Sequence, residues 1–180
     1  MVSGPSGAGK GTLIRGALDR VPDLAVAVSA TTRAMRPGEV DGREYHFMSR
    51  AEFARLVEQG AFLEHAEFAG NRYGTLASEL DRIMGTGRSV ILEIELQGAR
   101  NVRRARPDCV SVFIEPPSLD ELARRLRHRA TDAEEEIEAR LEVARIEMSA
   151  RGEFDHVILN DDVGRATDAL VDTISGEMAA

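Results

Sequence analysis

Several features that would assign a chain to a particular class of protein are scarce in these 180 residues. There is one cysteine, Cys109, so no disulfide can form within the chain, which is typical of a reducing cytosol. No run of about 18 apolar residues could cross a membrane, and the first residues show neither the basic nor the apolar region of a signal peptide. We therefore expect a cytoplasmic protein with no membrane partner.

Positive charge is also in short supply. Lysine and arginine together number 23 against 31 acidic residues, so the formal net charge is −8 at pH 7. This balance disfavours a non-specific nucleic-acid binder, because the nucleic-acid backbone would be repelled. All but one of the 23 cations are arginines, and the exception is Lys10. A compact ammonium differs from a planar guanidinium in the contacts it makes, so Lys10 is singled out for a function.

Lys10 lies in a glycine-rich segment that fits the phosphate-binding pattern G-x(4)-G-K. The segment comprises Gly4, Pro5, Ser6, Gly7, Ala8, Gly9, Lys10, Gly11 and Thr12. Glycines let successive backbone N–H groups turn toward a phosphate chain, and the helix that follows adds its positive dipole end. Gly11 stands where a Mg²⁺-binding Ser or Thr is usual, and Thr12 comes one place late. We predict an ATP phosphate site with Lys10 reaching the β- and γ-phosphates.

Short apolar stretches alternate with helical patterns along the chain. We predict strands at residues 24–29, 89–94, 109–114 and 157–159. We predict helices at residues 10–18, 50–59, 76–84, 97–105 and 167–174. A further helix follows a cap at Ser118 and ends at about residue 129, and a long one follows a second cap signature at residues 132–135 and ends at about residue 150. This alternation predicts an α/β fold of the P-loop NTPase type, with a mainly parallel sheet and helices on both faces.

Two segments interrupt this pattern within a single predicted domain of residues 1–180. Residues 29–75 carry repeated turn signals between short apolar runs, which predicts an insertion built on a small mixed sheet. Residues 118–151 are rich in charge and predict a helical lid. The core would then comprise residues 1–28, 76–117 and 152–180.

Ordered motifs along almost the whole chain resemble guanylate kinase. They are the glycine loop, the segment 29–45 (SATTRAMRPGEVDGREY), Glu64 with Tyr73-Gly74-Thr75, Leu96-Gln97-Gly98, and Arg129 with Arg140. The resemblance implies transfer of the γ-phosphoryl group of ATP to GMP or dGMP, giving ADP and GDP, within purine nucleotide metabolism. It also implies Mg²⁺ bound with ATP.

The resemblance further implies a GMP site. Its residues would be Ser29, Arg33, Arg36, Tyr45, Glu64, Tyr73, Thr75 and Glu95. Arg33 and Arg36 would hold the GMP phosphate bidentately, or they are simply solvated turn charges. Tyr45 and Tyr73 would add hydroxyl donors, or pack ordinarily. An ionised Glu64 accepts hydrogen bonds, so it would read the adjacent N–H groups of guanine that adenine lacks. We interpret His65 beside it as a packing residue.

Acidic and basic residues beyond the insertion complete the predicted active site. Glu93 and Glu95 end an apolar strand and would hold Mg²⁺ through water, or form structural salt bridges. By resemblance, Arg129 and Arg140 are catalytic lid arginines together with Lys10 and Arg33. Arg125 and Asn160 would contact ATP. The alternative for the arginines is a solvated basic face balanced by nearby acidic residues.

The GMP phosphate is already anionic, so we expect catalysis by positioning and charge neutralisation without a general base. Two other functions stay open. One is a guanylate-kinase-like module that binds protein partners without catalysis. The other is a kinase for a different small acceptor. The sequence leaves the oligomeric state open between monomer and dimer.

Overall fold

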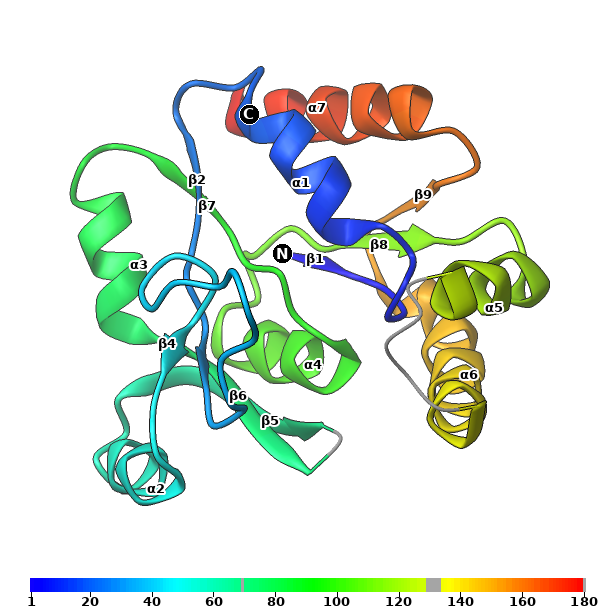
Figure 1. The fold of residues 1–180 in the computed structure, drawn as a ribbon. Coiled ribbons are helices and arrows are strands. Elements are labelled where there is room, and N and C mark those ends of the chain that lie inside the picture. The colour runs from blue at the N-terminus through cyan, green and yellow to red at the C-terminus, as the bar shows by residue number, and fades with distance from the viewer. Residues whose placement is uncertain (69, 129–133, 180) are drawn as a thin grey trace. The chain divides into compact units, whose positions relative to one another are not determined.

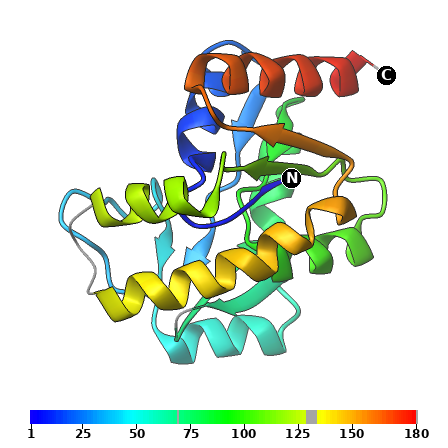
Figure 2. The same ribbon diagram turned by 90° about the vertical axis from the view of Figure 1, so that its right-hand side faces the viewer.

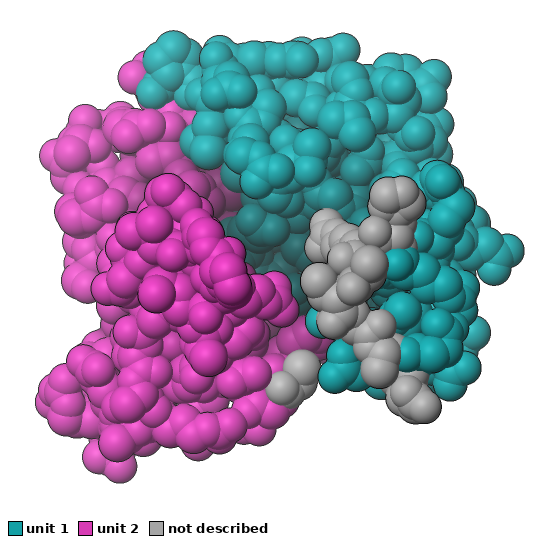
Figure 3. All heavy atoms as spheres, viewed as in Figure 1, with its two compact units in different colours: residues 1–22, 93–96, 110–180 teal, residues 23–92, 97–109 magenta. Residues whose placement is uncertain are grey.

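The computed structural model describes residues 1–68, 70–128 and 134–179. The chain forms two compact units, coloured separately in Figure 3. The first unit comprises residues 1–22, 93–96 and 110–180, and the second comprises residues 23–92 and 97–109. Among the residues that the structure describes, no helix is both long and apolar enough to span a membrane.

The first unit contains a parallel sheet in the order β1-β8-β9. Its strands are β1 (Val2–Ser3), β8 (Val112–Glu115) and β9 (His156–Leu159). Its helices are α1 (Lys10–Leu18), α5 (Leu119–His128), α6 (Glu134–Ser149), the 3₁₀ turn η1 (Arg151–Glu153) and α7 (Val163–Ala179). Helix α1 packs along α7, and α5 packs along α6 (Figures 1 and 2).

The second unit contains two sheets. Strands β2 (Leu24–Val26) and β7 (Ser89–Ile91) pair in parallel. The other sheet has the order β4-β3-β6-β5 and is mixed, because β3 pairs in parallel with β4 and antiparallel with β6. Its strands are β3 (Ala30–Thr31), β4 (His46–Phe47), β5 (Phe62–Phe68) and β6 (Asn71–Leu76). The helices are α2 (Arg50–Glu58), α3 (Ala77–Met84) and α4 (Leu96–Ala105).

Strands pair in parallel between helices, and a mixed sheet is formed by strands within residues 30–76. This arrangement confirms the predicted fold class. The strands expected at 24–29 and 89–94 are shorter than predicted. Beyond β2 and β7, Ala27 N still donates to Ile91 O at 2.9 Å, whereas Glu93 forms an isolated bridge with Val2 of β1. These apolar runs therefore extend past the regular ladder.

Helix boundaries follow local capping. The Ser118 hydroxyl accepts a 3.1 Å hydrogen bond from Glu121 N, as the capping pattern predicted. The Glu121 carboxylate accepts hydrogen bonds from Arg124 and Arg125 of the same helix. Helix α7 begins earlier than the predicted residue 167, because Asp162 Oδ1 accepts from Arg165 N at 2.9 Å and caps it.

The α5–α6 pair encloses a small core of its own. Leu122 and Leu126 of α5 pack against Ile137 and Ala144 of α6, and all four are at most 3% exposed. Their helical spacing places them on facing stripes, so burial of these side chains stabilises the pair. This pair covers the described part of the segment 118–151 that the sequence predicts to be a lid.

Candidate active site

The glycine loop follows β1 directly and leads into α1. Gly4 and Gly9 have φ values of 138° and 97°, which an L side chain adopts only with strain. A Cβ atom at Gly4 would collide with the Ile114 carbonyl oxygen, and one at Gly9 would collide with the Asn160 amide. The glycines are therefore required both by backbone conformation and by close packing.

Lys10 is the first residue of α1 and is 7% exposed. Its ammonium group donates to the carbonyl oxygens of Gly4 and Pro5, the second at 3.3 Å. It also forms an ion pair with Glu95, with 3.6 Å between Nζ and Oε1. The buried charge is therefore neutralised and held within the loop, at the position where the sequence predicts the ATP phosphates.

Glu93 and Glu95, for which the sequence analysis predicts Mg²⁺ binding, lie beside the loop in the first unit. A Cβ atom at Gly11 would lie 3.6 Å from both Glu93 carboxylate oxygens, so the missing side chain leaves space next to this group. Loss of hydration raises the pKa of Glu93, and Lys10 opposes the rise. In the described part of the chain, no cluster of three or more His, Cys, Asp or Glu residues could hold a metal.

Glu147 of α6 lies next to Glu95, and no sequence pattern singles it out. It is 5% exposed, and its carboxyl group lies close to that of Glu95. Burial first, and then the charge of Glu95, raises the pKa of Glu147 to about 8. A protonated Glu147 could donate to the half-buried Glu95 carboxylate, which would allow the two carboxyl groups to lie close together. In the sequence it is one of many acidic residues of a charged helix.

Asn160 follows β9 and is 2% exposed. Its side-chain amide donates to the Ala8 carbonyl oxygen at 2.7 Å, so it contacts the glycine loop itself. Arg125 of α5 donates to the Asn160 carbonyl oxygen at 3.1 Å and to Glu121 at 2.9 Å. The predicted ATP-site residues of α5 and of the β9–α7 loop are thereby connected. Arg140 lies partly buried on α6, and Arg129 lies outside the described residues.

Glu64 and Thr75 face each other across β5 and β6 in the second unit. Glu64 is 5% exposed, and Thr75 donates to Glu64 Oε1 from its backbone N–H at 3.0 Å and from its hydroxyl at 2.9 Å. Burial raises the pKa of Glu64, and the two bonds from Thr75 partly offset this. Among the described residues only Thr75 donates to this carboxylate, so Oε2 can accept from a ligand.

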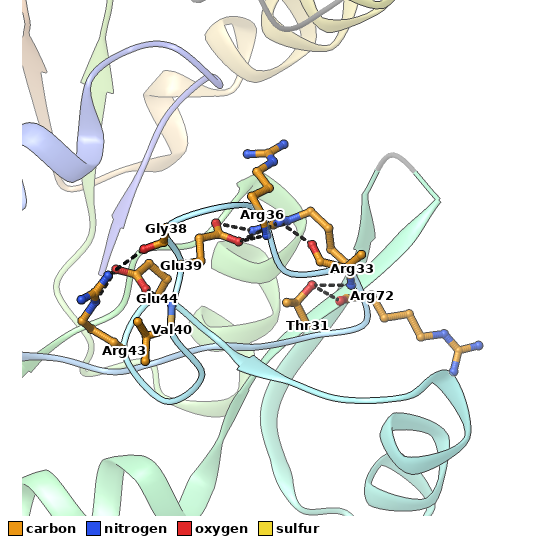
Figure 4. A network of polar contacts seen from close by, with 10 residues as sticks. Thr31, Arg33, Arg36, Gly38, Glu39, Val40, Arg43, Glu44 and Arg72 are labelled. Atoms are coloured by element: carbon orange, nitrogen blue, oxygen red, sulfur yellow. Dashed lines mark hydrogen bonds and ion pairs between the residues drawn. The ribbon is translucent and has the colours of Figure 1, made fainter.

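Arg33 lies near the two tyrosines that the sequence selects. Its guanidinium carbon is 5.3 Å from the Tyr45 ring centre, and the Tyr45 and Tyr73 ring centres are 6.0 Å apart. Glu39 binds the Arg33 guanidinium through two hydrogen bonds and also accepts from Arg36 N at 2.7 Å (Figure 4). The exposed Arg36 side chain points away from Glu39 in the same view.

Two further predictions concern neighbouring residues. Ser29 directly precedes β3, and its carbonyl oxygen accepts from His46 N of β4 at 2.9 Å. The His65 ring contacts Phe53 and Phe62 edge-on, with ring centres 6.3 and 6.0 Å away, which confirms its packing role. Glu39, in contrast, was not selected from the sequence, because it reads as an ordinary charge after the turn at Pro37-Gly38.

Comparison with known proteins gives a consistent result. The family model for guanylate kinase matches residues 1–177. A guanylate kinase from Rubrobacter xylanophilus is 58% identical over 172 residues, covering 96% of this chain and 90% of the relative. One from Frankia casuarinae is 52% identical over 176 residues, covering 98% and 96%. The crystal structure of guanylate kinase from Anaplasma phagocytophilum matches with a TM-score of 0.80 at 34% identity, covering 98% of this chain and 85% of that one. The chain therefore belongs to the guanylate kinase family, whose enzymes use ATP to phosphorylate GMP to GDP.

Proposed function

We propose that this chain transfers the γ-phosphoryl group of ATP to GMP or dGMP through the residues described above. The observation that carries this assignment is the Glu64–Thr75 pair. One oxygen of a buried carboxylate is saturated by two donors, and the other can accept from a base. Guanine presents a ring N–H and an amino group side by side, whereas adenine has no N–H group at its ring N1. Such a carboxylate selects guanine over adenine.

On the GMP side, Arg33 and Arg36 would bind the phosphate, and Tyr45 and Tyr73 would donate from their hydroxyls. Ser29 and Thr75 would contribute smaller contacts, and Glu95 would orient the acceptor. The close proximity of Arg33, Tyr45 and Tyr73 supports this assignment. A guanidinium next to two phenols offers several donors to one phosphate, and a phosphate is bound best by several converging donors.

On the ATP side, the loop N–H groups and Lys10 would hold the phosphates. Within residues 118–151, Arg129 and Arg140 would neutralise charge on the transferring group. Arg125, together with Asn160 of the β9–α7 loop, would contact ATP. Incoming phosphate oxygens would replace the loop carbonyls as acceptors for Lys10, because an anionic oxygen is the stronger acceptor. The proposed division into a core (1–28, 76–117 and 152–180), a GMP-binding insertion (29–75) and a lid (118–151) follows from these roles.

The residues beside the loop fit a Mg²⁺ ion brought with ATP. Mg²⁺ keeps several waters and takes only one or two protein carboxylates, so a dense cluster of ligands is not needed. Glu93 next to the space at Gly11, and Glu95 beside Lys10, would hold it through water. When bound, the ion would neutralise charge on the transferring phosphoryl group.

The acceptor oxygen of GMP needs no general base, since the phosphate is ionised near neutral pH. The protein would then act by aligning the two nucleotides and by placing positive charge where the transferring group becomes more negative. Lys10, Arg33 and Arg140 are the described residues with this role. Removing one such cation lowers turnover by about 100-fold or more in comparable sites.

The test is ADP release by the purified protein with ATP, Mg²⁺ and each of GMP, dGMP, AMP and UMP. We expect transfer to GMP and dGMP and much slower transfer to the other two. Lys10→Ala should abolish transfer and leave the far-UV spectrum unchanged, whereas Arg145→Ala, at an exposed pair with Glu142, should retain activity. GMP binding without ADP release would favour the binding module, and equal rates with AMP would refute the role of Glu64.

A further inference from the structure

We propose that Glu39 is a positioning residue that fixes the Arg33 guanidinium so that one of its edges is presented to the GMP phosphate. This inference rests on the proposed GMP site, in which Arg33 binds that phosphate. It assigns to Glu39 a role carried out through Arg33, and no contact between Glu39 and the nucleotide is part of it.

Glu39 and Arg33 form a two-pronged ion pair. Arg33 Nη1 donates to Glu39 Oε2 at 3.0 Å, and Arg33 Nη2 donates to Glu39 Oε1 at 2.7 Å (Figure 4). Both side chains are largely shielded, with 13% and 17% of their surfaces exposed. Two parallel bonds between planar groups fix the rotation of the guanidinium as well as its position. Glu39 therefore determines which way Arg33 faces.

The remaining donors of Arg33 can be assigned one by one. A guanidinium carries five N–H groups. Glu39 accepts from one on each Nη atom, and the Ala34 carbonyl oxygen accepts from Nη1 at 2.7 Å. The other two N–H groups, on Nε and Nη2, have no acceptor among the described residues. They lie parallel on one side of the guanidinium, and this spacing suits two oxygens of a phosphate.

The position of the Glu39 carboxylate is itself fixed by a second hydrogen bond. Glu39 Oε2 also accepts from the Arg36 backbone N–H at 2.7 Å, which ties the carboxylate to the turn between the two arginines. The Tyr45 and Phe47 rings lie 5.3 and 5.6 Å from the Arg33 guanidinium carbon. The hydrogen bond to Arg33 lowers the pKa of Glu39, so the pair stays ionised in the neutral range. Arg33 is thus held in place before any ligand arrives.

Pre-positioning of this kind should affect GMP binding more than ATP binding. Without Glu39, the Arg33 side chain would sample several rotamers, and ordering it would oppose phosphate binding. If Glu39 instead competed with the phosphate for Arg33, removing Glu39 would strengthen GMP binding. The direction of the change therefore decides between positioning and competition.

The experiment compares Glu39→Gln, Arg33→Ala and the double variant, in the full chain, for GMP dissociation constants and for KM of GMP and ATP. We expect Glu39→Gln to weaken GMP binding by about tenfold and to change KM for ATP less than about twofold. In the Arg33→Ala background the same change should have no further effect, because Glu39 acts through Arg33. Glu44→Gln is the matched control: Glu44 also accepts from a backbone N–H and an arginine on this loop, Val40 and Arg43, but does not touch Arg33.

Each outcome bears on one claim. If Arg33→Ala leaves GMP binding unchanged, the proposed phosphate site is wrong, and with it this inference. If Arg33→Ala weakens binding but Glu39→Gln leaves it unchanged or strengthens it, only the positioning role is refuted. An equal loss in Glu39→Gln and Glu44→Gln, or an additive loss in the double variant, would assign Glu39 to general loop stability and also refute the role.

Discussion

The Asn160 side chain donates a 2.7 Å hydrogen bond to the carbonyl oxygen of Ala8, and so ties the β9–α7 loop to the glycine loop across 152 residues of sequence. Asn160 is 2% exposed, and its own backbone N–H donates to Glu115 O at 2.8 Å at the end of β8. One buried residue therefore connects the phosphate loop with the sheet behind it. This contact fixes the direction of the Ala8 carbonyl, and hence of the neighbouring N–H groups.

Replacing Asn160 should destabilise the glycine loop and weaken ATP binding. We expect Asn160→Ala to lower the free energy of unfolding by about 1–3 kcal/mol, because it leaves a buried carbonyl oxygen without its donor. KM for ATP should rise while KM for GMP changes little. Chemical denaturation and steady-state kinetics measure the two effects. Asn101→Ala is the matched control, since Asn101 makes the same kind of bond, to His65 O at 3.0 Å, in an exposed position. Equal losses in both variants would contradict a special role for Asn160.

A side chain at Gly9 should be more costly than one at a glycine with open surroundings. Gly9 and Gly87 both have positive φ values, 97° and 78°, so alanine pays about 1–2 kcal/mol of backbone strain at either. At Gly9 the new Cβ also collides with Asn160, whereas nothing lies within 4 Å at Gly87. We expect Gly9→Ala to lose at least about 1 kcal/mol more than Gly87→Ala in urea unfolding. Equal losses of stability in the two variants would show that the glycine loop can accommodate the added Cβ atom at no extra cost.

The Glu64–Thr75 pair predicts how the base site discriminates. In Glu64→Gln the amide oxygen would stay with the two Thr75 donors, which turns the amide NH₂ toward the donors of guanine. Two facing donors repel, so kcat/KM for GMP should fall by about 100-fold, with a much smaller change for AMP. Glu67→Gln, at an exposed position on the same strand, should retain GMP activity. Retention of GMP preference by Glu64→Gln would contradict this reading of the site.

The same residue predicts a pH dependence of stability. Burial raises the pKa of Glu64 above its ordinary value of 4.5, so above that pH the folded protein binds more protons than the unfolded chain. The contribution of Glu64 to the free energy of unfolding is therefore largest below 4.5 and falls as the pH rises through the folded-state pKa. Glu64→Gln cannot titrate, so its stability relative to the parent should improve as pH rises from 4.5. Denaturant midpoints at several pH values measure this, and a pH-independent difference would refute it.

Local sequence patterns predicted a large part of the fold. The loop at Gly4–Thr12, the helix that starts at Lys10 and the cap at Ser118 depend on contacts within a few residues, so spacing alone locates them. The ends of β2 and β7 were placed too late, because an apolar run shows burial but does not show where the neighbouring strand diverges.

The sequence by itself predicted the class of the protein, the glycine loop and the residues that we propose bind GMP. Only the tertiary structure decided how those residues are held. Glu64 receives two bonds from Thr75 because β5 and β6 pair in one register, and Arg33 faces Glu39 because the turn between them closes. Asn160 reaches Ala8 through the order of the parallel strands. Contacts of this kind depend on register, burial and chain closure, which are properties of the folded chain as a whole.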